Sequence, residues 1–462
     1  MSSDRNYKRA LGLVIALVGF VSACAPAAPG PSTAQPIPNE NGAPPAATEI
    51  QPPSYPSASA GTPAGQFEQP PIVDISELLP PSELSGPGYQ LEPQVPTNGA
   101  MGQYVLTADS EVFHDAAGTY QVESLDLLKI RLSEAPAIAQ LENMSQSAVF
   151  AKELATSAER PVADAANMVM HPMDTVTGLP SGVGEFFGRV GGGAEELYST
   201  ATNSSESGGA RASQTAEETG NITLTALGYD QVRRDLAKQV HVDPYSSDPV
   251  LTRLLNHIAW VMFSARLAVN TAVTVAVPGS IIITGTEFTD DLIYQTPKGD
   301  LIMLVHNKLK DIGLSPKEIA TFSANSAIPL SLQVTAVHEL ERLGDIPGRR
   351  GAAVMLGSVM TEYQARFLVT SLQMLADWSA QKSPLTGIQI QGILVAQDQN
   401  GTSIVPAPID YLSWTPRIAG FATNPALLAL PNRVIWIPAK MTPLAQQQLA
   451  ANGWTVQTDP QP

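Results

Sequence analysis

The chain has 462 residues and a formal net charge of −17 at pH 7, and 15% of its residues are charged. A chain this acidic repels nucleic acid and anionic membrane surfaces, so we expect no nucleic-acid partner. It contains a single cysteine, which excludes internal disulfides and metal sites built from several thiolates.

A short apolar run follows three basic residues at the start of the chain. Arg5, Lys8 and Arg9 precede residues 10–21, a segment that is too short to span a bilayer and has the layout of a signal-peptide core. The run ends in Val-Ser-Ala-Cys, with the cysteine at position 24. An ordinary signal peptide or a signal anchor would share the apolar run without giving the cysteine a role.

This tetrapeptide resembles the lipobox of bacterial lipoproteins, in which the signal peptide is cut before the cysteine and lipid is attached to it. The resemblance covers residues 1–24 alone. It implies a signal peptide at 1–23, palmitate-type acylation of Cys24 and stable anchoring by more than one chain. An aspartate after the cysteine often marks inner-membrane retention, so Ala25 favours the outer membrane. The resemblance leaves open whether the body faces the periplasm or the cell surface.

Residues 24–100 are rich in Pro, Ala, Gly, Ser and Gln. Such a composition cannot bury enough apolar surface to offset the entropy lost on ordering, and proline stiffens the chain. We therefore predict a lipidated, disordered spacer over this range. The segment 72–79, IVDISELL, is its one apolar island and predicts a short docking helix.

The next part of the body, residues 101–220, is predicted to be a helical region with a glycine-rich and a polar loop. Alternation predicts short strands near 104–113 and 118–122. A helical period follows from 124 to 155, and Pro136 should break or kink this helix.

Residues 221–383 are predicted to form a helical core domain. Asp248 should cap a helix that continues to about residue 277, and Ser315 with Glu318 matches a capping box. Two further helices, over 329–344 and 352–381, are expected to pack as an antiparallel hairpin.

The C-terminal residues 384–462 are predicted to form a small α/β unit. Asn400-Gly401 between two apolar stretches indicates a β-hairpin. The order strand, helix, strand over 433–458, with Thr442 as the helix cap, indicates a βαβ unit. The fold class is therefore α+β: a predominantly helical body with a small C-terminal β-hairpin plus βαβ unit, after a disordered N-terminal spacer.

A glycine-rich stretch, 181–193, is the nearest approach to a nucleotide loop. Gly182, Gly184 and Gly188 are one residue too widely spaced, and no strand precedes them. We expect no cofactor here. Val183, Phe186, Phe187 and Val190 at helical spacing predict a short helix that docks on the core. An amphipathic segment whose Phe186 and Phe187 contact a membrane or a partner is the alternative.

Candidate chemical groups are few. His338 and Glu339 resemble half of a zinc-binding helix, but Arg342 stands where the second histidine should be. We expect no metal site. The best carboxylate cluster, beside a predicted strand, consists of Glu287, Asp290 and Asp291.

The segment 258–278 is almost long enough and apolar enough to cross a bilayer. Arg266 near its middle makes insertion costly, so a buried central helix is favoured. A hairpin that dips into the bilayer and a pore-lining segment are the alternatives.

Taken together, these patterns predict a lipid-anchored bacterial envelope protein with a binding, scaffold or assembly role. Its partners would be the bilayer, through the acyl anchor, and another envelope protein. The absence of an assembled catalytic constellation favours a non-enzyme. The alternatives are a hydrolase-type enzyme that uses Glu287, Asp290 or His338, and a lipid- or small-molecule-handling protein with 258–277 as a cavity wall.

Overall fold

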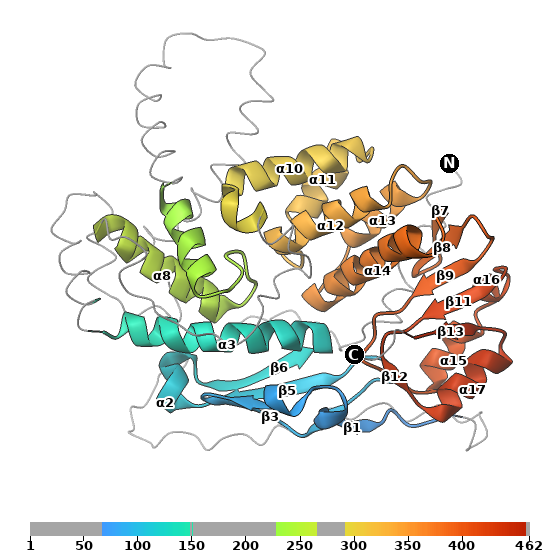
Figure 1. Cartoon of the computed structure of the whole chain (residues 1–462), viewed down its shortest axis with the longest axis horizontal. Helices are drawn as coiled ribbons and strands as arrows, with labels where there is room; N and C mark the ends of the chain where they lie inside the picture. Colours follow the sequence, from blue (N-terminus) through green and yellow to red (C-terminus); the bar gives the residue numbers. More distant parts are fainter. Residues whose placement is uncertain (1–66, 148–149, 151–227, 266–291, 459–462) are drawn as a thin grey trace, which may run out of the picture.

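The structure, a computed structural model, describes residues 67–147, 150, 228–265 and 292–458 (Figure 1). Within these ranges a group of helices lies on one side of a small N-terminal antiparallel sheet, and a mixed C-terminal sheet lies beside both. The α+β class with a predominantly helical body is as predicted.

An antiparallel sheet opens the described chain. Its strand order is β2-β3-β5-β6, and β1 pairs separately with β4. The strands are β1 (Ile72–Asp74), β2 (Ser85–Gly86), β3 (Tyr89–Leu91), β4 (Gln94–Pro96), β5 (Gln103–Ala108) and β6 (Gly118–Glu123), with the short helices η1 (Ile75–Glu77), η2 (Pro81–Glu83), α2 (Ser110–Phe113) and η3 (His114–Ala116) between them. Along β5, residues alternate between buried and more exposed positions, as in a sheet with one covered face.

The spacer predicted for residues 24–100 extends too far along the chain. Val73 and Val95 are paired between β1 and β4 and are both buried, and Leu91 is buried in β3. The prolines and glycines of this stretch fall largely between very short strands. They dominate the composition, so the composition gave no sign of the few apolar side chains that pair between these strands. The island at 72–79 begins as a strand and continues as η1 (Ile75–Glu77). Residues 24–66 lie outside the described residues.

Helix α3 (Leu125–Ser145) covers this sheet. Leu128 and Leu132 share a buried cluster with Tyr104 and Val122 of the strands. The helix continues through Pro136, so of the predicted break or kink the break is wrong. Burial of apolar side chains on both sides of the proline compensates for the hydrogen bond that it cannot donate.

The helical group follows. It contains α8 (Pro249–Ala265), α10 (Lys298–Asp311), α11 (Pro316–Ser323), α12 (Leu330–Arg342), α13 (Arg349–Leu356) and α14 (Glu362–Gln381), and residues 228–239 and 292–295 are also helical. The predicted caps are confirmed. Asp248 accepts hydrogen bonds from the backbone N–H groups of Val250 and Leu251, and Ser315 with Glu318 forms the capping box.

Helices α12 and α14 are parallel, not antiparallel as predicted. Both begin beside the loop 243–248, where Ser331 of α12 and Glu362 of α14 bind its side chains. At the other ends, Arg342 and Asp377 form an ion pair at 2.5 Å. The predicted helix over 352–381 is in fact two helices, and α13 carries the chain back before α14 starts.

The C-terminal sheet has the order β13-β11-β9-β8-β7. Its strands are β7 (Leu385–Ile390), β8 (Leu394–Asp398), β9 (Ser403–Pro406), β11 (Arg433–Trp436) and β13 (Thr455–Gln457); β10 (Tyr411–Leu412) pairs with β12 (Lys440–Met441), and the helices are α15 (Pro416–Ala422), α16 (Pro425–Leu428) and α17 (Pro443–Ala451). The predicted β8–β9 hairpin and the parallel β11-α17-β13 unit are confirmed. A second hairpin, β7–β8, was missed because its turn at Gly392 lies inside one apolar stretch.

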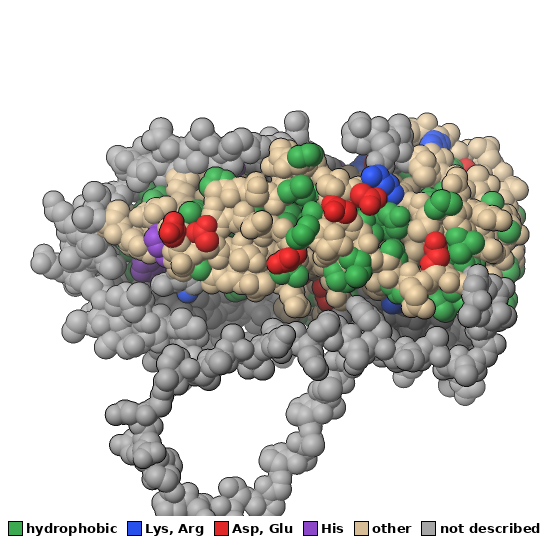
Figure 2. Space-filling view, turned by 90° about the horizontal axis from the view of Figure 1, so that it is seen from below, with side chains coloured by type: hydrophobic (Ala, Val, Ile, Leu, Met, Phe, Trp, Pro, Cys, Tyr) green, Lys and Arg blue, Asp and Glu red, His purple; other side chains and the backbone are tan. Residues whose placement is uncertain are grey.

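The C-terminal sheet is covered on both sides. Helix α14 packs against β7, β8 and β9, whereas α15 and α17 lie on the other side (Figure 1). One buried apolar cluster includes residues from Ala100 to Trp454 and so runs through all three predicted regions of the body. Seen from below, the side of the N-terminal sheet carries apolar side chains in separate groups, with acidic side chains between them (Figure 2).

Limited proteolysis of the full chain tests the corrected boundary of the spacer. Early cuts in the N-terminal part should fall before residue 67, because paired and buried backbone resists proteases until it opens. N-terminal sequencing of the protected fragments checks this. Rapid cleavage between 72 and 100 would contradict the pairing of β1 with β4.

Gly348 offers a sharp test of how β7 is held. Its φ is +90°, and a Cβ there would lie 1.8 Å from the carbonyl oxygen of Ile388. We expect Gly348→Ala to lower the free energy of unfolding by roughly 2–4 kcal/mol, through overpacking and backbone strain. In the control Gly420→Ala the new Cβ meets nothing within 4 Å, so stability should stay the same or rise slightly. Equal denaturation curves for the two variants would contradict this account.

Candidate functional site

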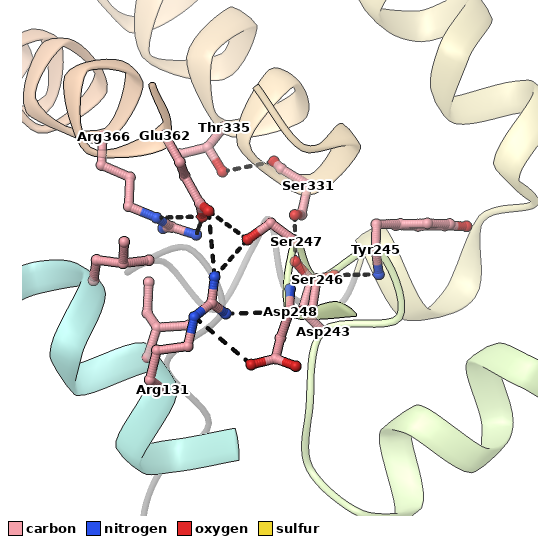
Figure 3. Close-up of polar contacts among 12 residues, drawn as sticks. Arg131, Asp243, Tyr245, Ser246, Ser247, Asp248, Ser331, Thr335, Glu362 and Arg366 are labelled. Carbon is pink, nitrogen blue, oxygen red and sulfur yellow. Dashed lines mark hydrogen bonds and ion pairs between the residues drawn. The ribbon is translucent and has the colours of Figure 1, made fainter. Parts of the chain in front are cut away.

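A cluster of buried and half-buried polar side chains surrounds the loop 243–248, between the helical segment 228–239 and α8. Its sequence, Asp-Pro-Tyr-Ser-Ser-Asp, favours turns because Asp and Ser side chains bond nearby backbone. Asp243 accepts a hydrogen bond of 2.7 Å from the backbone N–H of Tyr245, and Asp248 caps α8. The loop therefore presents two serines to the helices around it (Figure 3).

Arg131 of α3 is the centre of this cluster. Its Nη1 lies 2.5 Å from Oε2 of Glu134, and its Nη2 donates to Oγ of Ser247 at 2.6 Å. Nη2 also lies 3.3 Å from Oε2 of Glu362 on α14, and Nε lies 3.9 Å from Oδ2 of Asp248. One guanidinium thus binds groups from α3, the loop and α14 (Figure 3).

Glu134 is buried and shares Arg131 with Asp248. Burial raises the pKa of Glu134 to about 7, and the charge of Asp248 raises it further; Arg131 and the hydroxyl donated by Ser246 act in the opposite direction. The carboxyl group therefore changes its proton occupancy near neutral pH.

Glu362 lies in the opposite electrostatic situation. Burial by itself would raise the pKa of Glu362, but Arg366, Arg131 and the hydroxyl of Ser247 outweigh burial and hold that pKa below its ordinary value. Arg366 binds Oε1 of Glu362 through both Nε, at 2.9 Å, and Nη2, at 2.7 Å. Such a two-point contact fixes the geometry of both side chains.

Asp243 ties the same loop to α12. Its carboxylate accepts a hydrogen bond from the hydroxyl of Ser331, and burial raises its pKa above the ordinary value. In turn Thr335 donates to the backbone oxygen of Ser331 at 3.0 Å. The loop is thus held by α12 as well as by α3 and α14.

We name Arg131, Glu134, Asp248, Glu362 and Arg366 the polar clamp. Each member bonds another member or a serine of the loop, so the donors and acceptors are largely engaged within the protein. Buried ion pairs of this kind hold a specific arrangement and make loss of one partner costly. The chemistry that the clamp supports is therefore positioning of helices.

The structure places one of the predicted catalytic candidates. His338 is half-buried on α12, and burial together with Arg342 lowers its pKa. Its neighbour Glu339 is fully buried and accepts a hydrogen bond of 2.6 Å from Arg342, which also reaches Asp377. His338 thus stands beside an ion-pair network that joins α12 to α14.

Other predicted positions lie outside the described residues. They are Cys24, Gly182, Gly184, Phe186, Phe187, Gly188, Arg266, Glu287, Asp290 and Asp291. Of the apolar segment 258–278, residues 258–262 are buried in α8, in line with the favoured central helix, and the chain beyond 265 is not described. In the ranges that the structure describes, no helix has the length and apolar character to cross a membrane, and no three His, Cys, Asp or Glu side chains are grouped to hold a metal ion.

The polar clamp itself was missed from the sequence. Asp248 was identified as a helix cap, but nothing indicated its proximity to Arg131. The available signal was the pair of adjacent serines, Ser246 and Ser247, between two aspartates. Such a loop can bind side chains as well as its own backbone.

Two substitutions in the polar clamp should show opposite pH dependence. Because the pKa of Glu134 is raised, its contribution to stability is full below about pH 4.5 and is lost as pH rises through about 7, by an amount of about 3 kcal/mol. The stability deficit of Glu134→Gln should therefore shrink as pH rises from 5 to 8. Because the pKa of Glu362 is lowered, its contribution is present above about pH 4.5 and is lost on acidification. The deficit of Glu362→Gln should shrink as pH falls.

Urea unfolding of both variants and the wild type across pH 4 to 8 measures these differences. Contributions from other groups are common to the proteins compared and cancel in the differences. Parallel pH profiles for the two variants would contradict the electrostatic assignment of the clamp.

Comparison with family models, with curated proteins and with solved structures gives no match for this chain. Its function is therefore argued from its own residues.

Proposed function

We propose that the protein is a lipid-anchored bacterial envelope protein that acts by binding or scaffolding, with its body held away from the outer membrane. The observation that carries this proposal is the cysteine at position 24. It follows a signal-peptide-like run and is the one cysteine among 462 residues. This single cysteine stands at the position where the lipobox pattern places the acylated residue. Such a placement suits a lipid anchor.

The described body supports a binding or scaffold role over catalysis. The polar clamp binds helices to one another, and His338 stands beside a second ion-pair network. A general base needs a geometry in which it can reach a substrate proton. Here the buried carboxylates of Glu134, Glu339 and Glu362 instead contact arginines of the same protein.

The connection between tether and body also suits a tethered scaffold. Near the start of the described chain, Glu68 accepts hydrogen bonds from the backbone N–H of Trp414, at 2.6 Å, and from the hydroxyl of Thr442, at 2.7 Å. The N-terminal end of the body is thus bound to the C-terminal unit.

Metabolic labelling with a palmitate analogue tests the anchor. In cells that process lipoproteins, the wild type should carry label and sediment with membranes. Cys24→Ala should lose the label and move to the soluble fraction, because no acyl chain remains to bind the bilayer. Membrane retention without label on the wild type would refute the proposal.

Ala25→Asp is the matched variant for the choice of membrane. By the resemblance to lipoproteins it should keep the label while shifting from the outer to the inner membrane fraction in a density gradient. A pull-down from detergent-solubilised envelope, with Cys24→Ala as the comparison, then tests for an envelope partner. A labelled protein that captures no partner would keep the anchor and remove the scaffold role.

A further inference from the structure

Residues 99–102, which lead into β5 of the N-terminal sheet, lie against residues 410–415 of the C-terminal unit. Backbone hydrogen bonds connect the two segments, from Asp410 to Ala100 at 2.9 Å and from Ser413 to Gly99 at 3.0 Å. The approach is close, because a Cβ at Gly99 would lie 2.7 Å from Cγ2 of Thr415. We name these two segments the joint.

Asp410 places a buried carboxyl group in the joint, with 6% of the residue exposed. Its Oδ2 accepts three hydrogen bonds, from the backbone N–H groups of Gly102 at 2.8 Å and Leu125 at 3.0 Å and from the hydroxyl of Tyr104 at 3.1 Å. Tyr104 belongs to β5, and Leu125 is the first residue of α3. One oxygen atom of the C-terminal unit therefore binds both the N-terminal sheet and the helix that covers it.

The three donors to Asp410 are neutral groups, whereas the carboxylates of the polar clamp meet arginines. Of the ionisable groups that face Asp410, the phenol of Tyr104 stays neutral because burial raises its pKa, and Asp126 of α3 is acidic. Glu68 and Glu77, near the next residue along the chain, are acidic as well. An ionised Asp410 thus keeps much of the desolvation penalty of a buried charge.

The protonation of Asp410 is coupled to closure of the joint. Burial, the largest cause, raises the pKa of Asp410 from 3.8 to about 6, and the three donors oppose this only in part. A carboxyl group with a raised pKa favours the closed structure when it is protonated. Its contribution to closure is therefore complete below about pH 4 and is lost as pH rises through about 6.

We propose that the joint is a pH-responsive contact, which is tightly closed in acid and opens more often as Asp410 ionises. Ionisation places a charge among neutral donors, and opening lets water hydrate that charge. The polar clamp holds α3 to the helical group separately, so the opening is local to the joint. This response does not depend on the lipid anchor, and it makes the contact between the N-terminal sheet and the C-terminal unit depend on the acidity of the surroundings.

Hydrogen–deuterium exchange of the full chain in detergent, from pH 4 to pH 8, tests this proposal. The amides of Gly102 and Leu125 exchange when their bonds to Asp410 open. After correction for the intrinsic pH dependence of exchange, their opening constant should rise roughly fiftyfold between pH 4 and pH 7 and then level off. Amides in the middle of α14 are the internal reference and should change less. No rise at the joint, or an equal rise in α14, would overturn the proposal.

Asp410→Asn removes the ionisable group while keeping its shape, so the amides at the joint should lose this rise. Asp398→Asn is the matched control. Asp398 is also buried, but its carboxylate accepts hydrogen bonds from the backbone of its own turn, at Asn400 and Thr402. This control should keep the rise of the wild type at the joint. A rise of wild-type size in Asp410→Asn would show that another group controls the opening and would overturn the proposal.

If Asp410→Asn does not fold, Tyr104→Phe takes its place. The hydroxyl of Tyr104 lowers the pKa of Asp410, so its removal should raise that pKa further. The opening constant at Gly102 and Leu125 should then level off at a higher pH than in the wild type. A plateau at the same pH as in the wild type would count against Asp410 as the responsive group.

Discussion

The position of Arg131 constrains three separate parts of the described body at once. A buried guanidinium has to be neutralised where it stands, because it cannot lose its proton and is costly to leave unpaired. Its carboxylate and hydroxyl partners come from α3, the loop 243–248 and α14. One face of α3 covers the N-terminal sheet. Because the same helix carries Arg131, it fixes the sheet relative to the helical group.

A second buried group, Asp410, ties the C-terminal unit to the N-terminal sheet. Its Oδ2 accepts hydrogen bonds from the backbone N–H groups of Gly102, at 2.8 Å, and Leu125, at 3.0 Å, and from the hydroxyl of Tyr104, at 3.1 Å. Burial raises its pKa to about 6, while these donors act to lower it. Together with the polar clamp, this carboxyl group ties the N-terminal sheet, the helical group and the C-terminal unit to one another. The continuous apolar cluster that runs through all three fits this arrangement.

These two ties also bear on the proposed function. A protein that works by binding partners while attached to a membrane needs a body that keeps its shape, and buried ionic contacts between distant segments supply that constraint. The members of the polar clamp bind charges of their own protein. Because these charges are engaged internally, the groups that carry them hold the fold.

The sequence by itself determined the features that depend on neighbouring residues. The caps at Asp248, Ser315 and Thr442 and the hairpin at Asn400-Gly401 were predicted correctly because a few adjacent side chains bond their own backbone. The anchor at Cys24 stays a prediction of the same local kind, carried by a short motif.

Tertiary structure alone decided the rest. Arg131 meets Glu362 across 231 positions and Ser246 meets Glu134 across 112, and no periodicity in one sequence reports such a pairing. Similarly, the parallel setting of α12 and α14 follows from contacts at both their ends, and the strands within 67–100 are stable because their few apolar side chains pair and are covered. Local chemistry sets where elements begin and end, whereas burial and charge neutralisation between distant segments set how they meet.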